Sequence, residues 1–311
     1  MRRLFPLPAP ATTPASSAAS PSSAPPAPST PPAPSAPPAS SAAAPGGTEG
    51  APPGANGSAG PDPATDREWT LDELADAYAY PAADDPVRSG RPGWLRANMV
   101  SSLDGAAHHE GRSHPLSGDA DMRIFGVLRA LSDAVVVGAE TVRLEGYRPA
   151  RARAAFAARR AAAGQGPAPA IAVVTAGLGL DFTLPLFTEP LVPTLVLTGA
   201  GAPEERVRAA RAAGVEVLFA GEGTGVDPAR VAEVLAAKGH TRLLTEGGPR
   251  LLGQFAAAGA LDELCLSLAP VVTAGGAQRI MDGPAVAVPE RFALVSVLEE
   301  SGFLFTRYRR S

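Results

Sequence analysis

The stretch Arg242-Leu-Leu-Thr-Glu-Gly-Gly-Pro-Arg-Leu-Leu252 carries the pattern from which the fold can be inferred. Residues 242–245 have the composition of a buried strand, and Glu246 places a carboxylate where that strand ends. The two glycines that follow permit a tight bend, and Pro249 suits a first helical turn because its missing N–H would have no partner there. The start of such a helix binds anions. The pattern predicts a phosphate cradle beside an acid; the alternative is a strand–helix turn that merely uses glycine.

Strand-like and helix-like segments alternate along the chain on both sides of this stretch. We expect strands at residues 94–100, 134–137, 171–175, 194–198, 215–219, 242–245, 263–272, 293–299 and 303–308, and a strand or flap at 106–109. We expect helices at residues 71–79, 151–163, 204–213, 228–238 and 249–258, a short one from Gly138, and one that begins after an N-cap at Ser117. This alternation predicts an α/β fold with a mainly parallel sheet flanked by helices. Glu300-Ser-Gly302 predicts an antiparallel hairpin at the C-terminal end.

The composition of the chain divides it in two. Residues 1–66 are rich in Pro, Ala and Ser and offer little large apolar surface to bury, so we expect them to be disordered. Residues 1–7 include Leu4, Phe5 and Leu7, and the sequence leaves open whether they pack on the domain. Residues 67–311 form the predicted folded domain, which starts with a capping box of Thr70 and Glu73.

Charge and cysteine content exclude several classes of protein. The net charge of −4 and the lack of a basic block argue against nucleic acid as a partner. A single cysteine, Cys265, rules out a disulfide framework and fits a cytoplasmic location. No apolar run is long enough to span a membrane. His108-His-Glu-Gly-Arg-Ser-His114 lacks the spacing of a zinc site, so we expect no metal.

Polar side chains gather where the predicted strands end. Asp104 follows the first core strand, Thr141 follows the second, and Glu246 follows the strand of the opening stretch. Open α/β sheets bind ligands at the carboxyl ends of their strands, so these three residues are expected to face one crevice. An Asx-turn before Gly105 is the competing reading of Asp104. Several arginines between residues 148 and 153 suit a phosphate-bearing substrate, and an exposed helix face is the competing reading.

Five motifs in order resemble those of the pyrimidine reductase domains of bacterial riboflavin biosynthesis. They are Ser102-Leu-Asp-Gly105, Leu128-Arg-Ala-Leu-Ser-Asp-Ala134, Val137-Gly-Ala-Glu-Thr-Val142, Glu246-Gly-Gly248, and Leu261-Asp-Glu-Leu264 with Leu268-Ala-Pro270 and Gly275-Gly276. The resemblance extends from about residue 94 to the C-terminus. It implies a dihydrofolate-reductase-like α/β fold, NADPH as cofactor and a homodimer. The implied reaction reduces 5-amino-6-(5-phosphoribosylamino)uracil to its ribitylamino product.

Two other functions stay open from the sequence. One is a dihydrofolate or other pterin reductase of the same fold, and the other is a non-catalytic protein that binds NADP. A zinc deaminase precedes the reductase in bifunctional relatives, and residues 1–66 occupy that place here. We therefore expect reductase activity alone.

The resemblance also assigns roles to individual residues. Asp104 and Glu246 are expected at the reaction, and Ser113, Arg129 and Arg151 at the substrate. The positions expected at the cofactor are Val100, Gly138, Thr141, Glu145, Gly247, Gly248, Pro249, Arg250, Leu251 and Leu252. Residues 147–153 do not align one by one with relatives, which leaves the phosphate arginine open. Pro115 stands where relatives have an aromatic residue near the nicotinamide.

Overall fold

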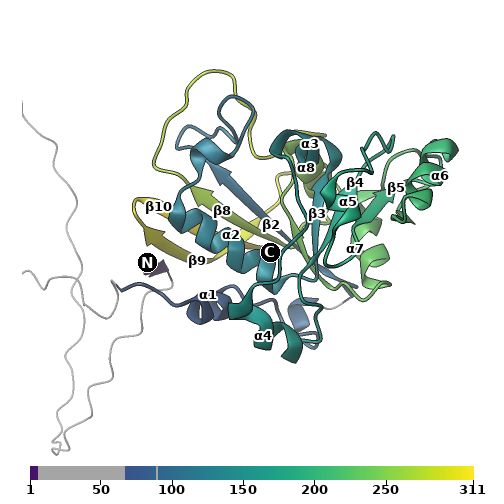
Figure 1. Cartoon of the computed structure of the whole chain (residues 1–311). Helices are drawn as coiled ribbons and strands as arrows, with labels where there is room; N and C mark the ends of the chain where they lie inside the picture. Colours follow the sequence, from purple (N-terminus) through teal and green to yellow (C-terminus); the bar gives the residue numbers. More distant parts are fainter. Residues whose placement is uncertain (6–66, 89) are drawn as a thin grey trace, which may run out of the picture. The chain divides into compact units, whose positions relative to one another are not determined.

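A computed structural model describes residues 1–5, 67–88 and 90–311. Within these residues ten strands form one sheet in the order β1-β9-β10-β8-β2-β7-β3-β4-β5-β6. The strands are β1 (Arg2–Phe5), β2 (Trp94–Ser101), β3 (Ala134–Gly138), β4 (Ala170–Val174), β5 (Leu195–Thr198), β6 (Glu216–Phe219), β7 (Arg242–Thr245), β8 (Glu263–Leu268), β9 (Phe292–Glu300) and β10 (Phe303–Arg310). Figure 1 shows the β9–β10 hairpin at one end of the sheet and β5 near the other.

The pairing of the strands confirms the predicted α/β class. From β8 to β6 all neighbours are parallel, whereas β10 pairs antiparallel with both β8 and β9. The hairpin turns at Ser301 and Gly302, whose φ angles of 53° and 81° are both left-handed. That geometry is typical of the two-residue turns that join antiparallel strands. The predicted C-terminal hairpin is therefore confirmed.

Helices cover both faces of the sheet. The helices are α1 (Leu71–Ala77), α2 (Asp119–Leu131), α3 (Ala139–Glu145), α4 (Ala157–Ala162), α5 (Pro185–Thr188), α6 (Glu204–Ala212), α7 (Pro228–Ala236) and α8 (Pro249–Ala257), with 3-10 turns η1 (Pro86–Arg88), η2 (His114–Leu116) and η3 (Ala154–Phe156). Successive strand residues point to opposite faces, so Val135 packs with α1 and α2 while Val136 packs with α7 and α8. The central parallel strands are thus buried on both sides, as their apolar runs predict, whereas the edge strand β6 is exposed at both of its ends.

Several predicted boundaries were wrong. No strand forms at residues 106–109; a single bridge joins His109 to Arg112 within a loop. Gly118, not Ser117, is the N-cap of α2, and it makes no side-chain cap. The predicted helix at 151–163 begins only at η3, after an extended segment. Strand β8 ends at Leu268, four residues earlier than expected, because the chain then turns toward the Ser102–Asp104 loop.

The first five residues depart from the prediction of disorder for residues 1–66. Strand β1 pairs with the outer edge of β9, and Met1 is only 7% exposed. Arg2 forms an ion pair with Glu299 at 2.7 Å, which holds the strand at this edge. The rest of the predicted disordered segment, residues 6–66, lies outside the described residues. Residues 67–311 form one compact unit together with β1, and the capping box of Thr70 and Glu73 is present in α1.

Candidate active site

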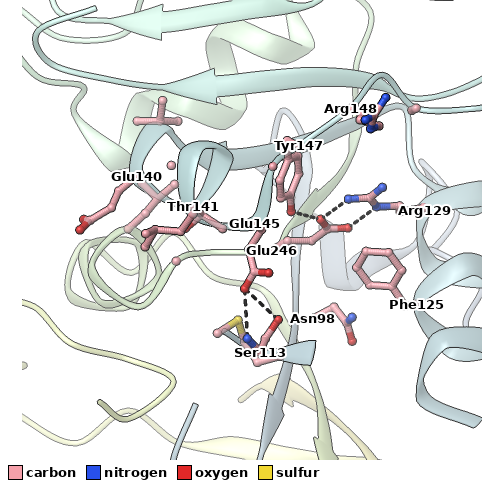
Figure 2. A pocket seen from close by; sticks show the side chains of 18 of the residues that line it. Asn98, Ser113, Phe125, Arg129, Glu140, Thr141, Glu145, Tyr147, Arg148 and Glu246 are labelled. Atoms are coloured by element: carbon pink, nitrogen blue, oxygen red, sulfur yellow. Dashed lines mark hydrogen bonds and ion pairs between the residues drawn. The ribbon is translucent and has the colours of Figure 1, made fainter. Parts of the chain in front are cut away.

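A large cavity opens at the carboxyl ends of β2, β3, β4 and β7. Its volume is about 1120 Å³, and its walls come from α2, α3, the start of α8 and the segment 106–118, called the flap below. Figure 2 shows part of this cavity, with Arg129 of α2 and Tyr147, just after α3, pointing toward Glu246. Ligands of open α/β sheets bind at this edge. The cavity therefore lies where the sequence places the functional site.

Glu246 joins a side chain of α2 to one that follows α3. The Nε and Nη2 atoms of Arg129, on α2, donate to its two carboxylate oxygens at 2.7 and 2.6 Å. The hydroxyl of Tyr147, just after α3, donates to Glu246 Oε2. The Arg129 guanidinium also lies 4.3 Å from the Phe125 ring centroid and 5.4 Å from that of Tyr147. Figure 2 shows the resulting cluster, in which two aromatic rings and a carboxylate fix one guanidinium.

Local backbone geometry brings Tyr147 to this cluster. Gly146 ends α3 with a φ of 63°, a left-handed value that glycine adopts without a steric cost. The N–H of Tyr147 then donates to Val142 O at 3.0 Å, which turns the chain back toward the cavity. A helix that ends in this way satisfies one of its last carbonyls. The phenol is therefore held by the turn as well as by Glu246.

The cluster keeps both of its donors protonated. Burial raises the pKa of Tyr147 well above its ordinary value, and the neighbouring charge of Glu246 raises it further. Burial works to lower the pKa of Arg129, but the charge of Glu246 outweighs it and holds that pKa above its ordinary value. At neutral pH the Glu246 carboxylate thus accepts hydrogen bonds from a cation and from a neutral phenol.

The wall expected to hold the cofactor is built by two strand–helix turns in contact. The Gly138 N–H, after β3, donates to Gly247 O, after β7, at 2.7 Å. Gly248 is the N-cap of α8, and a β-carbon there would lie 2.5 Å from Thr141 Oγ1. Glycine is required at this position because the Thr141 side chain comes so close. The first turn of α8 presents free backbone N–H groups to the cavity beside a threonine hydroxyl, which suits a phosphate group.

Most of the positions predicted to bind the cofactor line the cavity. They are Val100, Gly138, Thr141, Glu145, Gly248, Pro249, Arg250 and Leu251. Two predicted positions do not. Leu252 is fully buried in the core beneath α8, and Gly247 faces Met99 on β2. For Leu252 this follows from helical geometry, since successive residues of α8 cannot all face one side, whereas Gly247 precedes the helix.

The flap reaches the end of α3 through Ser113. Its backbone N–H and its hydroxyl both donate to Glu145 Oε1, at 3.1 and 3.0 Å. Both residues line the cavity. The resemblance places one at the substrate and the other at the cofactor, and the structure brings them into direct contact (Figure 2).

Asp104 is placed differently from the prediction. It does not line the large cavity but a smaller depression of about 300 Å³. Its carboxylate accepts hydrogen bonds from the hydroxyl of Ser102 and from the N–H groups of Thr273 and Ala274, at 2.5, 3.1 and 2.7 Å. These hydrogen bonds lower the pKa of Asp104 to about 2. Asp104 thus ties the loop at Thr273 and Ala274 and does not line the large cavity; its hydrogen bonds are not those of an Asx-turn, because the N–H of Ala106 donates to Ser102 Oγ.

The arginines of the extended segment line the end of the cavity beyond Arg129. Arg151, predicted to contact substrate, lies there with Arg148 and Arg153. Within the described part of the chain, none of these three has an acidic side chain at ion-pair distance. This end of the cavity is therefore positively charged and open to an anion.

Sequence reasoning missed two residues of the site. Tyr147 carried no motif of its own, although its place after a helix-ending glycine was visible. Asn98 lies on β2, is 9% exposed and lines the cavity, and its Oδ1 has no hydrogen-bond partner among the described residues. A buried amide oxygen without a partner is costly, so a ligand that donates a hydrogen bond would stabilise it. An amide residue between Ala97 and Met99 in a predicted core strand was the available signal.

The described residues contain no group of three side chains that could ligate a metal ion. No helix there has both the length and the apolar character needed to cross a bilayer.

Known proteins are similar to this chain in sequence. The model of the RibD C-terminal domain matches residues 93–300. The chain is 31% identical over 200 residues to a 2,5-diamino-6-ribosylamino-4(3H)-pyrimidinone 5′-phosphate reductase of Archaeoglobus fulgidus, covering 64% of this chain and 88% of that protein. A reductase of the same name from Methanothermobacter thermautotrophicus is 31% identical over 190 residues, 61% of this chain and 83% of that one.

Solved structures are also similar to this chain. A pyrimidine reductase-like protein of Corynebacterium diphtheriae superposes with a TM-score of 0.64 at 26% identity, covering 76% of this chain and 98% of the other. Acinetobacter baumannii RibD, at 21% identity and a TM-score of 0.53, shares the fold. The family match spans the strands and turns that build the cavity, including all the motifs from Ser102 to Gly276. The chain belongs to the RibD C-terminal domain family.

Proposed function

We propose that this protein reduces a 6-ribosylaminopyrimidine 5′-phosphate in riboflavin biosynthesis, with NADPH as the reductant. The observation that carries the proposal is the arrangement of one cavity with two unlike ends. One end offers the start of α8 and Thr141, which suit the phosphates of a dinucleotide. The other end offers arginines without an ion-pair partner among the described residues, which suit the phosphate of a sugar. The Glu246 cluster lies between them.

The residues of the first end fit a nicotinamide dinucleotide. Gly248 leaves the backbone of α8 open beside Thr141, and no acidic residue occurs in the first turn of that helix. The pyrophosphate would be held by the N–H groups of this turn, with Val100 and Glu145 nearer the reaction. When bound, the cofactor supplies a hydride.

The protein's own contribution is to hold and orient the substrate. Opening the ribose ring gives an imine at C1′, and its reduction adds a hydride to the carbon and a proton to the nitrogen. Glu246 already accepts three hydrogen bonds, so we assign it the role of fixing Arg129 and Tyr147 and not that of a proton carrier. Arg129 binds Glu246 through Nε and Nη2, which leaves its Nη1 group for the substrate, and Asn98 offers to a pyrimidine N–H an amide oxygen that has no partner among the described residues.

Two pyrimidines are candidates for the substrate. Our prediction from the sequence is 5-amino-6-(5-phosphoribosylamino)uracil, whereas the archaeal relatives bear the name of a 2,5-diaminopyrimidinone reductase. The two compounds differ at C2, which carries an oxygen in the first and an amino group in the second. The homodimer and the cytoplasmic location stay predictions.

The test is a comparison of four reductase assays with the purified full chain. Three assays use NADPH as reductant, each with one substrate: the uracil, the diaminopyrimidinone or dihydrofolate. The fourth assay uses NADH in place of NADPH. All four follow the loss of absorbance of the reduced nicotinamide. Turnover of either pyrimidine supports the proposal and names the substrate. Turnover of dihydrofolate alone would replace it with the pterin reductase, and NADPH binding without any turnover would favour the non-catalytic protein.

A further inference from the structure

Helix α2 has a glycine on the face that it turns toward the cavity. The three atoms closest to a β-carbon placed on Gly126 all belong to the Arg153 guanidinium, and Cζ and Nη2 would lie 2.7 and 2.8 Å away. Real side chains do not approach so closely. Arg153 therefore occupies the space that the missing side chain of Gly126 leaves on the surface of α2.

This contact fixes one arginine among several. The Arg153 guanidinium is bounded by the backbone of α2 on one side and lies 5.9 Å from the Phe156 ring centroid on another. Arg148 and Arg151 line the same end of the cavity, but neither guanidinium lies over an aromatic ring of the described residues. An arginine that is already held loses less conformational entropy when it binds a ligand. Of the three arginines in the extended segment, Arg153 is thus the one that is prepared for an anion.

A second, buried arginine adds to the positive charge of the same end. Arg160 lines the cavity and is 4% exposed. Its Nη1 atom donates to the carbonyls of Ala130 and Ser132 at the end of α2, both at 2.8 Å, and its Nε donates to Gly166 O at 2.7 Å. Its Nη2 has no partner among the described residues. Because a buried guanidinium nitrogen without a partner is costly, this end favours a ligand with several acceptor oxygens.

We propose that Gly126 is a specificity-determining residue, which seats Arg153 as the arginine that binds the 5′-phosphate of the substrate. The inference rests on the proposed function for the identity of the ligand. A phosphate monoester presents three acceptor oxygens and up to two negative charges, and the planar guanidinium binds it through two parallel hydrogen bonds. A side chain at residue 126 would displace this guanidinium and leave the rest of the cavity unchanged. Selection of phosphorylated over dephosphorylated substrates then depends on a residue that bears no charge.

The test compares Gly126→Ala with the wild type in binding D-ribose 5-phosphate and D-ribose, by calorimetry on the NADPH-loaded protein. We expect the Kd for the phosphate to rise by about tenfold or more, since hydrogen bonds to charged groups are the strong ones. Binding of ribose should not change. Arg153→Ala should give the same loss, and the double variant should be no worse than either single variant, because both remove one interaction.

Two controls separate this effect from general damage. Arg159→Ala removes a neighbouring arginine that lies outside the cavity and pairs with Asp76 at 2.8 Å, so it should leave both Kd values unchanged. Alanine is a better helix former than glycine, and its methyl group meets only the end of a flexible side chain, so Gly126→Ala should unfold no earlier than the wild type. Thermal unfolding of each variant checks this.

The outcomes that oppose the inference differ from those that oppose the proposed function. Equal affinity of the wild type and Gly126→Ala for ribose 5-phosphate would overturn the inference even if the reductase assays succeed. The inference would also be overturned if the fold loss of affinity in the double variant equalled the product of the two single losses. Failure of the reductase assays, with phosphate-selective binding that Gly126→Ala abolishes, would instead overturn the reaction and leave the anion site standing. In steady-state kinetics with the phosphorylated pyrimidine, Gly126→Ala should raise KM and change kcat much less.

Discussion

Asp104 and Glu246 are two acids that follow neighbouring parallel strands, β2 and β7, yet only one of them faces the cavity. Glu246 comes directly after β7, and α8 begins three residues later, so the carboxylate stays at the sheet edge. Asp104 comes three residues after β2, beyond a turn, and binds the backbone of a loop. The difference teaches that the distance from the strand end, and the helix that follows, decide whether an acid lines the crevice.

The sharpest test of this comparison is Glu246→Gln. Arg129 would lose the charge that holds it, and truncating one partner of a buried pair costs roughly 2–5 kcal/mol, so kcat/KM should fall by about a hundredfold or more. The matched change Asp104→Asn should alter kcat/KM by less than about threefold, as is usual away from a site. Steady-state kinetics on the pyrimidine phosphate measures both. Equal losses in the two variants would remove the distinction.

Tyr147→Phe should have the next largest effect. The ring would still pack beside Arg129, but Glu246 would lose its third donor, and a hydrogen bond to a charged group predicts a fall in kcat/KM of about tenfold. The change in thermal stability should be small because the aromatic volume is kept. A loss as large as that of Glu246→Gln would mean that the phenol itself takes part in the reaction.

A smaller effect is expected at the loop that Asp104 holds. Asp104→Asn weakens the acceptors of the Thr273 and Ala274 N–H groups, so these amides should exchange with solvent several-fold faster. Hydrogen exchange followed by mass spectrometry or NMR measures this. The amides of α8 should keep their wild-type rates, and Glu246→Gln should leave the two loop amides unchanged. Faster exchange in α8 for Asp104→Asn, or in the loop for Glu246→Gln, would mean that the two acids belong to one hydrogen-bond network.

The smallest effect concerns pH. The pKa of Asp104 in the folded protein is about 2, below its ordinary value of 3.8, because Ser102 and two backbone N–H groups bind the charged form. A lowered pKa contributes stability that is complete above the ordinary value and is lost as pH falls through the folded value. The difference in free energy of unfolding between wild type and Asp104→Asn should therefore shrink between about pH 4 and about pH 2. Urea titrations across this range would show it, and a constant difference would contradict it.

Most of the fold was predictable because it rests on local signals. The parallel strands β3, β5 and β7 are short apolar runs between helices, and the hairpin has glycine in its turn. The misplaced elements lack such signals. Residues 151–163 have helical composition, but the first part lines the cavity in an extended form, and tertiary contacts override propensity there. The edge strand β1 is only four residues long and follows from pairing with β9, which composition does not report.

The candidate site was predictable where a backbone pattern encodes it. Gly248 and Pro249 mark the start of α8 in the sequence itself, and they line the cavity. Side-chain partnerships were not predictable in this way. Glu246, Arg129 and Tyr147 come from three distant segments, and only the folded chain brings them within hydrogen-bond distance. The contact of Gly126 with Arg153 was equally unpredictable, since it depends on the side chain that glycine lacks.

The hydrogen bond between Gly138 N–H and Gly247 O has a consequence for how this enzyme can evolve. It ties the turn that carries Thr141 to the turn that carries Glu246, so the two binding functions share one piece of backbone. A substitution that adapts the start of α8 to a different nucleotide would also move the carboxylate that positions Arg129. Adaptive changes in these turns should therefore be strongly epistatic. A laboratory selection for altered cofactor use would be expected to recover paired substitutions, one in each turn, more often than single ones.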